Sequence, residues 1–309
     1  MIAPSAAVSV PATSANLGPG FDSLGLALEL RDQIEGRFIA GADVFVEVEG
    51  EGIGAVASDG SNLVARVVRT GLATFDPSGE LAARGLALRC VNAVPHSRGL
   101  GSSAAAIVGG LALAAQLAGV VGPDGVTAEQ LVALATRLEG HPDNAAAAVL
   151  GGATVAWTHE SALGPVGQAV RIDVDARVRP VVAIPVSQAS TAGARGALPA
   201  TVPHADASFN VARAALLTYA LSHDPSLLLE ATDDRLHQQQ RHSVYPESLD
   251  LVGALRQRGF AAAISGAGPT VVVLGVDDAG EIARGIGDLA GPSWRVLALR
   301  IASEGVRIS

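Results

Sequence analysis

Two patterns of apolar and polar residues run along the chain, and each predicts one kind of element. Short alternating or continuous apolar runs predict strands, whereas apolar residues three and four positions apart predict helices. The predicted strands cover residues 5–12, 86–94, 153–157, 179–186, 261–264, 270–275 and 295–301. The predicted helices cover residues 62–75, 102–118, 127–139, 208–222, 226–232, 247–258 and 278–290. Because the two kinds mix without a steady βαβ rhythm, the pattern favours an α+β fold over a doubly wound sheet.

Local sequence also predicts how some elements begin, end and connect. Two alternating runs within residues 34–48 predict a hairpin. Thr127, with Gln130 three residues later, is typical of a capping box at a helix start, and we expect that helix to stop near Gly140. The longer connections are expected to be loops, at residues 160–167 and 187–204.

The size of the chain indicates how many domains to expect. It has 309 residues, of which 49% are hydrophobic and only 3% aromatic. A sizeable core can form, built mainly from Ala, Val, Leu and Ile, and the length indicates about two domains. We expect the division near the predicted loop at 160–167, which gives one domain over residues 1–165 and another over residues 166–309.

The charged residues exclude several classes of protein. The formal net charge is −9, which argues against nucleic acid or an anionic membrane as the main partner. All 21 basic residues are arginine, and the chain has no lysine. P-loop NTPases, protein kinases and pyridoxal-phosphate enzymes each need a lysine, so all three are excluded. Any phosphate group must therefore be bound by backbone N–H groups, arginine or a metal ion.

Cysteine content and hydropathy indicate the setting of the protein. The single cysteine, Cys90, permits no intrachain disulfide, and its alternating surroundings predict a buried strand position. The first residues have no basic side chain before Arg31 and no long apolar block, so they do not resemble a signal peptide. The apolar stretch 104–122 is rich in Ala and Gly and contains Gln116, which favours a buried helix over a membrane span. We therefore expect a cytoplasmic protein.

The segment 95–103 reads PHSRGLGSS and leads from a predicted strand into a predicted helix. Gly99 and Gly101 permit positive φ and a close approach of the backbone to a ligand. The helix start supplies N–H groups and the positive end of the helix dipole, while Ser102 and Ser103 add hydroxyl groups that can also touch Mg²⁺. These features are typical of an anion-binding loop, although an ordinary strand-to-helix turn has similar glycines.

Three further polar loops are candidates for ligand binding. Within residues 9–22, Asn16 and Asp22 lie in a glycine-containing loop, where an amide and a carboxylate suit a zwitterionic ligand. Residues 265–269 read SGAGP between two short predicted strands, and residues 139–144 read EGHPDN just past a helix end. Taken singly, each loop has an ordinary turn or helix stop as its alternative.

The order of these motifs is more specific than any one of them. PATSANLGPGFD at 11–22, PHSRGLGSSAA at 95–105 and SGAGPT at 265–270 resemble the three motifs of the GHMP kinases. EGHPDN, STAGARGALP and DRLHQQQR add a resemblance to the homoserine kinases of that superfamily, although relatives often have Val-Ala-Pro where this chain continues with alanines. The resemblance spans essentially the whole chain. It implies an N-terminal domain like domain 2 of ribosomal protein S5, a ferredoxin-like C-terminal domain, an active site between them, ATP and Mg²⁺ as cofactors, and a homodimer.

The same resemblance implies roles for individual residues. The amino-acid substrate L-homoserine would bind Asp22 through its ammonium group, and two arginines through its carboxylate. The implied substrate-binding residues are Asn16, Asp22, His141, Thr191, Arg195 and Arg235. The implied nucleotide-binding residues are Asn62, Pro95, Arg98, Gly99, Leu100, Gly101, Ser102, Ser103 and Gly266, and the implied metal ligands are Ser102 and Glu139.

The catalytic residues implied by the resemblance are Asn16, Asp22 and Asn144. Asn144 stands where some GHMP relatives have an Asp that deprotonates the substrate hydroxyl, and an amide cannot act as a base. We expect Asn16 and Asp22 to align the hydroxyl instead. Asp143 is expected to point away from the site, because adjacent residues rarely share a direction.

Other interpretations remain open from sequence alone. Asn62 could cap the 62–75 helix, and Arg195 and Arg235 could form surface salt bridges. A GHMP kinase for another alcohol, such as mevalonate or a sugar, is a second function, but those substrates carry no ammonium group for Asp22. A catalytically silent nucleotide sensor of the same fold is a third, but the phosphate loop and the acidic metal ligand are both present.

Overall fold

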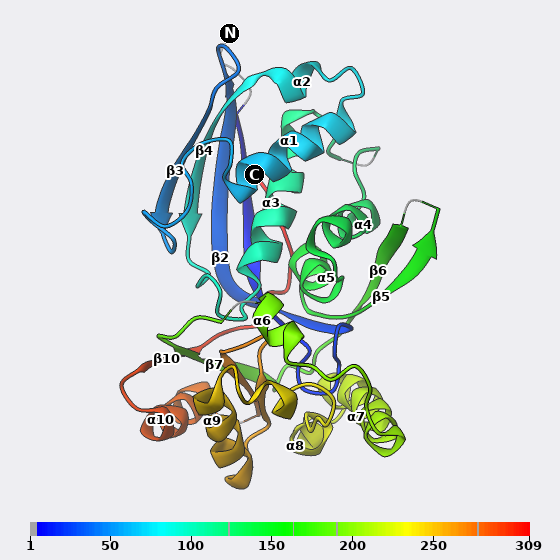
Figure 1. The fold of residues 1–309 in the computed structure, drawn as a ribbon, viewed down its shortest axis with the longest axis vertical. Helices are drawn as coiled ribbons and strands as arrows, with labels where there is room; N and C mark the ends of the chain where they lie inside the picture. The colour runs from blue at the N-terminus through cyan, green and yellow to red at the C-terminus, as the bar shows by residue number, and fades with distance from the viewer. Residues whose placement is uncertain (1–4, 123, 163, 190, 277) are drawn as a thin grey trace.

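The computed structural model describes residues 5–309 apart from 123, 163, 190 and 277, and the side chains of residues 191 and 192 are also left undescribed. Two α+β bodies lie one above the other, each built on its own sheet (Figure 1). The strands are β1 (Ser5–Ala15), β2 (Leu24–Ile39), β3 (Val44–Gly50), β4 (Gly85–Asn92), β5 (Ala153–Ser161), β6 (Gly164–Ile172), β7 (Arg179–Pro185), β8 (Ala262–Ile264), β9 (Val271–Gly275), β10 (Trp294–Ala298) and β11 (Arg307–Ile308). The helices are α1 (Leu63–Phe75), α2 (Glu80–Ala83), α3 (Ser102–Leu117), α4 (Ala128–Glu139), α5 (Asp143–Leu150), α6 (Thr191–Gly196), α7 (His204–Ser222), α8 (Leu228–Ala231), α9 (Pro246–Gln257) and α10 (Ala279–Ala290). The α+β prediction is confirmed.

The first sheet has the order β11-β1-β2-β4-β3, and β5 joins it by pairing with β2 and β6. The predicted hairpin within residues 34–48 is wrong, because β4 lies between β2 and β3 and pairs with β3 in parallel. Alternation shows that both runs are strands but carries no information on their partners. The segment between β3 and β4, which includes α1, returns the chain so that β4 lies between β2 and β3 and pairs with both.

Helix α3 is buried on nearly all sides, as the 102–118 pattern predicts. Its glycines let neighbours approach closely: a Cβ at Gly109 would lie 2.6 Å from Ile34, and one at Gly110 would lie 2.7 Å from Val67. Cys90 is 2% exposed on β4, and burial raises the pKa of its thiol to about 12, so it is the inert strand residue expected. Over the described ranges, no helix is long and apolar enough to cross a membrane.

The second sheet is antiparallel, with the order β10-β7-β9-β8. Helices α9 and α10 cover one face through a cluster that includes Leu255 and Ile286. The other face shares a cluster with the first body, in which Leu100 packs with Leu217 and Val182. This shared core fixes the loops at the junction, where the site described below lies.

Some predicted connections contain regular structure that the sequence pattern did not reveal. Strands β5 and β6 pair over residues 153–172, so the predicted loop at 160–167 is mostly a hairpin. The predicted loop at 187–204 contains the short helix α6. The domain division at 165/166 stays a prediction, since β6 follows that point yet pairs with β5, and β11 returns to pair with β1.

The predicted start and end of α4 are confirmed. Thr127 accepts from the backbone N–H of Gln130, and the Gln130 side chain accepts from the backbone N–H of Thr127, which completes the capping box. Gly140 ends the helix with a φ of 94°. Such a left-handed residue is favourable for glycine and directs the chain into the EGHPDN segment.

Candidate active site

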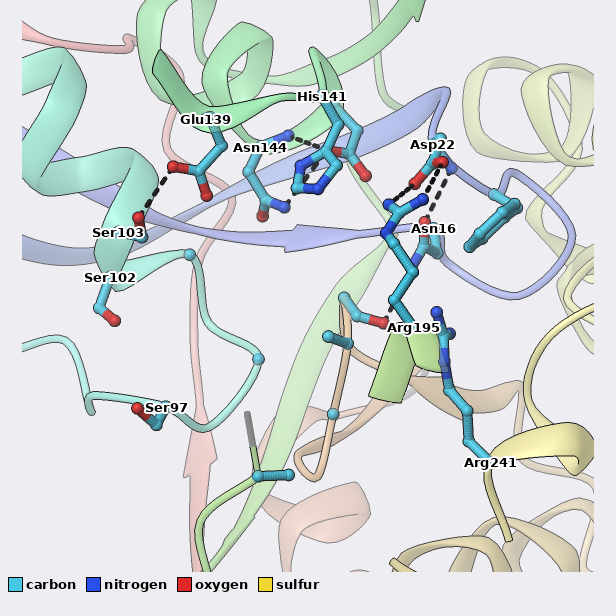
Figure 2. Close-up of a pocket in the computed structure, with 18 residues that line it drawn as sticks. Asn16, Asp22, Ser97, Ser102, Ser103, Glu139, His141, Asn144, Arg195 and Arg241 are labelled. Carbon is cyan, nitrogen blue, oxygen red and sulfur yellow. Dashed lines mark hydrogen bonds and ion pairs between the residues drawn. The ribbon is translucent and has the colours of Figure 1, made fainter. Parts of the chain in front are cut away.

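A cavity lies at the junction of the two bodies, and Figure 2 shows the side chains around it. Segments far apart in the sequence meet here: the β1–β2 loop, the loop before α3, the α4–α5 connection, α6, and the β8–β9 loop. The lining residues are Asn16, Phe21, Asp22, Ser97, Gly99, Gly101, Ser102, Ser103, Glu139, His141, Asp143, Asn144, Ala189, Arg195, Arg241, Gly266, Ala267 and Gly268.

The glycine loop before α3 adopts a conformation that requires its glycines. Gly99 and Gly101 have φ values of 76° and 69°, which L side chains rarely adopt. A Cβ at Gly99 would lie 2.3 Å from the Ser265 carbonyl oxygen, and one at Gly101 would lie 1.9 Å from the Thr13 hydroxyl. Gly101 caps α3 without a side-chain hydrogen bond. The first N–H groups of α3 therefore point into a loop that suits a phosphate group.

Direct hydrogen bonds join the three glycine motifs that the sequence singles out. The Asn16 side-chain amide donates to the Gly266 carbonyl over 2.8 Å, and the Gly266 N–H donates to the Ala15 carbonyl over 2.9 Å. The Ser265 hydroxyl donates to the Gly99 carbonyl over 2.6 Å. The three motifs, far apart in the sequence, are therefore in direct contact, and each motif holds the others in place.

Glu139 and the serines of α3 lie on one wall of the cavity (Figure 2). The Ser103 hydroxyl donates to a Glu139 carboxylate oxygen over 2.8 Å. Burial raises the pKa of Glu139, and the nearby Asp143 adds to this. A cation bound beside the Glu139 carboxylate would lower its pKa again, so the carboxylate suits a hard metal ion. Among the described residues, no three His, Cys, Asp or Glu side chains gather around a common point.

Asp143 and Asn144 both line the cavity, so the expectation that Asp143 points elsewhere is wrong. Asp143 and Asn144 are the first two residues of α5. At the N-terminus of a helix, two successive side chains can both reach a cavity that lies beyond that terminus. The Asn144 side-chain oxygen accepts from the Thr13 hydroxyl over 2.7 Å, and Asp143 accepts from the Asn144 N–H over 2.7 Å. Burial raises the pKa of Asp143 to about 6, although the hydrogen bond from Asn144 opposes this.

Asp22 and Arg195, predicted to bind opposite ends of the substrate, bind each other here. The two Arg195 Nη atoms lie 2.8 and 3.1 Å from the two Asp22 carboxylate oxygens. The Asn16 side-chain oxygen accepts from the Asp22 N–H over 3.0 Å, which holds Asp22 at a φ of 56°. A two-point ion pair of this kind offers one negative and one positive group to an incoming zwitterion.

Arg235 does not lie in the cavity. Its guanidinium is 3.6 Å from Asp206 and 3.8 Å from the centre of the Phe209 ring, and its side chain is 50% exposed. Arg241, from the same DRLHQQQR motif, lines the cavity instead and is 2% exposed. Its Nε donates to the Ala194 carbonyl over 2.9 Å, next to Arg195. The motif pointed to the correct segment, but the sequence does not show which arginine turns inward.

Comparisons with known proteins agree with this geometry. The models for the GHMP kinases N terminal domain and the GHMP kinases C terminal match residues 62–152 and 212–289. The chain is 48% identical over 308 residues to a homoserine kinase of Rhodococcus erythropolis, covering 97% of this chain and 94% of that one. The chain belongs to the homoserine kinase family.

Solved structures show the same fold as this homoserine kinase family member. A homoserine kinase from Cytophaga hutchinsonii matches with a TM-score of 0.84 and 24% identity, covering 100% of this chain and 98% of that one. A putative homoserine kinase from Listeria monocytogenes matches with a TM-score of 0.74 and 29% identity, covering 98% and 99%. The two-domain GHMP kinase fold expected from the motifs is thereby confirmed.

Several residues implied by the homoserine kinase resemblance lie near the cavity without lining it. Asn62 caps α1 by accepting from the Val64 N–H over 2.9 Å. It also borders a second hollow that reaches the glycine loop before α3 at Ser97. Its role near the base of a nucleotide stays a prediction. Arg98 donates to the backbone carbonyls of residues 96, 185 and 186, which positions the loop. Pro95 and Leu100 are buried within it.

Thr191 is the first residue of α6, and its side chain lies outside the described part of the structure. His141 lines the cavity beside Asn144 in Figure 2, as the prediction for a substrate contact requires. Gly266 lines it as well. The cavity-lining arginine that the sequence analysis missed is thus Arg241. The DRLHQQQR motif marks its segment, but no signal in the sequence separates it from Arg235.

Proposed function

We propose that the chain transfers the γ-phosphoryl group of ATP to the side-chain hydroxyl of L-homoserine, producing O-phospho-L-homoserine and ADP for threonine biosynthesis. The observation that carries this proposal is the placement of Asp22, Arg195 and Arg241 in one cavity with the glycine loop of α3. A carboxylate and two guanidinium groups suit an amino acid, whereas mevalonate and sugars carry no ammonium group.

Binding of the substrate would exchange one ion pair for two. The substrate ammonium would take the place of Arg195 on the Asp22 carboxylate, and the substrate carboxylate would take the place of Asp22 on Arg195. Arg241 would supply a second guanidinium, in place of the predicted Arg235. Guanidinium groups bind carboxylates through two parallel N–H bonds, which fixes orientation as well as charge. The hydroxyl at the far end would then be directed toward the phosphate loop.

As a GHMP kinase, the chain uses ATP. We propose that its phosphates bind the backbone N–H groups between Gly99 and Ser103, where the start of α3 favours an anion. The hollow bordered by Asn62 leads away from this loop and is the proposed place of the base. Because the chain has no lysine, backbone N–H groups, arginine and a metal ion are the groups left to neutralise the phosphate charge.

We propose that Mg²⁺ is held by Glu139 together with the hydroxyl of Ser103, which already donates to that carboxylate. Ser102 lines the same wall and stays a predicted ligand. Mg²⁺ commonly binds one or two carboxylates in addition to phosphate oxygens. When bound, the ion would neutralise charge on the phosphate groups.

The hydroxyl proton presents a separate question. Asn144 cannot accept it, and we propose that Asp143 does not need to. Phosphoryl transfer passes through a loose transition state in which early deprotonation contributes little, so the hydroxyl proton would leave late, to an oxygen of the transferred phosphoryl group or to water. Alignment by Asn16 and Asp22 would then carry most of the catalysis.

An ADP-release assay with L-homoserine, L-threonine, L-serine, mevalonate and galactose tests this function. We expect magnesium-dependent turnover with L-homoserine, strongly preferred over the two alcohols that lack an amino group. Turnover of mevalonate or galactose without turnover of L-homoserine would assign a different GHMP kinase. Nucleotide binding with no turnover of any of the five would indicate a silent sensor.

We also propose a cytoplasmic location, because the reaction consumes ATP. We further propose that the protein forms a homodimer, which analytical sedimentation would test.

A further inference from the structure

A buried histidine connects two parts of the amino-acid site. His237 is 0% exposed, and its two ring nitrogens make opposite kinds of contact. Nε2 is 2.6 Å from the Gly18 carbonyl oxygen, and Nδ1 is 2.7 Å from Nη1 of Arg241. A carbonyl only accepts and a guanidinium only donates, so Nε2 carries the hydrogen and Nδ1 presents its lone pair. Both contacts require the neutral ring in a single tautomer.

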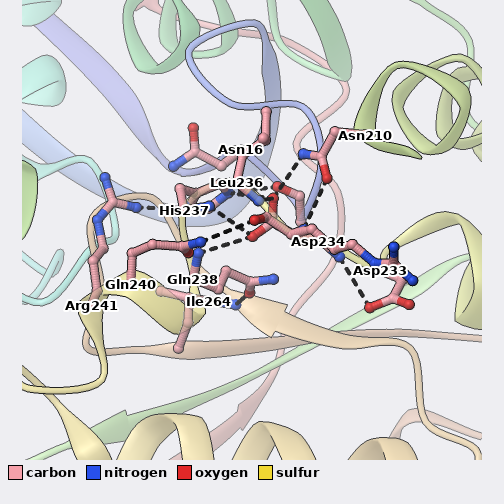
Figure 3. A network of polar contacts seen from close by, with 12 residues as sticks. Asn16, Asn210, Asp233, Asp234, Leu236, His237, Gln238, Gln240, Arg241 and Ile264 are labelled. Carbon is pink, nitrogen blue, oxygen red and sulfur yellow. Dashed lines mark hydrogen bonds and ion pairs between the residues drawn. The ribbon is translucent and has the colours of Figure 1, made fainter. Parts of the chain in front are cut away.

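The turn that carries His237 is itself rigidly held (Figure 3). One Asp234 carboxylate oxygen accepts from the Asn210 side chain over 2.8 Å and from the Leu236 N–H over 3.1 Å. The other oxygen accepts from the N–H groups of His237 and Gln238 over 3.1 and 2.9 Å. These bonds attach the turn to α7 and leave little freedom for the imidazole. Burial, followed by the charge of Arg241, lowers the pKa of His237, although Asp234 opposes this.

The imidazole reaches the loop that carries the ammonium-binding residues. Gly18 belongs to that loop, and the ring of His237 also stacks on Phe21 with their centroids 4.9 Å apart. Asp22 follows directly after Phe21. On its other edge, the imidazole holds Arg241, whose Nε is fixed by Ala194 beside Arg195. His237 therefore lies between the Asp22 loop and one of the two cavity arginines.

We propose that His237 is a positioning residue for the amino-acid substrate. It fixes the distance and orientation between Arg241 and the Gly18–Asp22 loop so that one zwitterion can contact both. This inference rests on the proposed function. An imidazole suits the role because it is rigid, it stacks, and it has a donor and an acceptor on opposite edges. A hydrocarbon of the same size would leave the Gly18 carbonyl and the Arg241 N–H without these partners.

The test compares His237→Phe with His237→Gln. The Phe variant keeps the ring and its stacking but loses both polar edges, whereas the Gln variant keeps one donor and one acceptor. We expect the Phe variant to raise KM for L-homoserine by about tenfold to a hundredfold, with KM for ATP within about twofold of wild type. The Gln variant should recover most of the homoserine affinity. His242→Phe makes the same chemical change at an exposed neighbouring position and serves as the matched control.

A double-variant cycle separates positioning from general destabilisation. If part of the effect of His237 passes through Arg241, then His237→Phe should raise the homoserine KM by a smaller factor in the Arg241→Leu background than in wild type, because only the contact with the Gly18 carbonyl is left to lose. The same factor in both backgrounds would overturn this coupling. An unchanged homoserine KM in His237→Phe, or equal losses for both substrates, would overturn the proposal while wild-type turnover of L-homoserine still supported the function. Absence of turnover in the wild type would overturn both. If the Phe variant does not fold, His237→Ala replaces it under the same criteria, because a smaller side chain cannot overpack the site.

Discussion

Replacing Asp143 by Asn should make the ligand-free protein more stable at neutral and alkaline pH. Asp143 is 3% exposed, and burial raises its pKa from an ordinary value of 3.8 to about 6. The folded state therefore binds this proton more tightly than the unfolded state does. The stability that the protonated Asp143 contributes to the folded state is fully present below about pH 4 and is lost as the pH rises through about 6. Asn keeps the oxygen that accepts from the Asn144 N–H but never ionises.

The size of the effect follows from the two pKa values. The difference between 3.8 and about 6 corresponds to roughly 3 kcal/mol in the free energy of unfolding once the carboxyl is ionised in both states. At about pH 4.5 only about 1 kcal/mol of this is lost, because the folded-state carboxyl is still mostly protonated. The advantage of Asp143→Asn over wild type should therefore grow by about 2 kcal/mol between about pH 4.5 and about pH 8.

Urea unfolding of both proteins at these two pH values, without nucleotide or magnesium, measures the difference directly. If the difference in free energy of unfolding between Asp143→Asn and wild type were the same at both pH values, an ionised Asp143 would not destabilise the folded protein, and the reasoning would be refuted.

The same Asp143→Asn variant also tests the mechanism. It should retain much of its kcat, whereas a general base contributes about 10²–10⁴-fold. A loss of that size, with folding and both KM values intact, would make Asp143 the base.

Three further predictions concern ligand binding. Arg195→Leu and Arg241→Leu should each raise KM for homoserine by about tenfold to a hundredfold, with little change in KM for ATP. Arg235→Leu, which changes a residue outside the cavity, should leave both KM values unchanged. If Arg235→Leu raised the homoserine KM and Arg241→Leu did not, Arg235 would be the substrate-binding arginine, as the sequence predicts. Glu139→Gln should lower activity and raise the magnesium requirement, because the amide lacks the charge of a carboxylate; an unchanged magnesium titration would move the metal role to another acid. Gly101→Ala should abolish most activity, since its Cβ would meet the Thr13 hydroxyl at 1.9 Å and strain a φ of 69°; near-normal turnover would show that the loop tolerates rearrangement.

The glycine motifs could be predicted from sequence because their constraints are local. At Gly99 and Gly101, positive φ and close backbone contacts permit no side chain, so these residues mark the loop wherever it lies in the fold. The capping box at Thr127 is local in the same sense. Helix α3 was predictable because a long Ala- and Gly-rich apolar run directly after such a loop favours a buried helix.

The pairing of strands and the direction of side chains in irregular turns could not be predicted in this way. Strand β3 pairs with β4 rather than β2, a choice made by the path of the intervening helix. Arg235 and Arg241 belong to one motif, and only the three-dimensional course of the turn places Arg241 inside and Arg235 against Phe209. The ion pair between Asp22 and Arg195 likewise depends on two segments 173 residues apart.

If the cavity binds a zwitterionic alcohol, removing the ammonium group from the substrate should impair turnover, and one comparison tests this most directly. Magnesium-dependent ADP release should be measured with L-homoserine and with 4-hydroxybutyrate, which has the same chain, hydroxyl and carboxylate but no ammonium group. We expect efficient turnover of L-homoserine and a kcat/KM for 4-hydroxybutyrate lower by at least about tenfold, because the Asp22 carboxylate would be left without a substrate partner. Equal kcat/KM values for the two alcohols would contradict it.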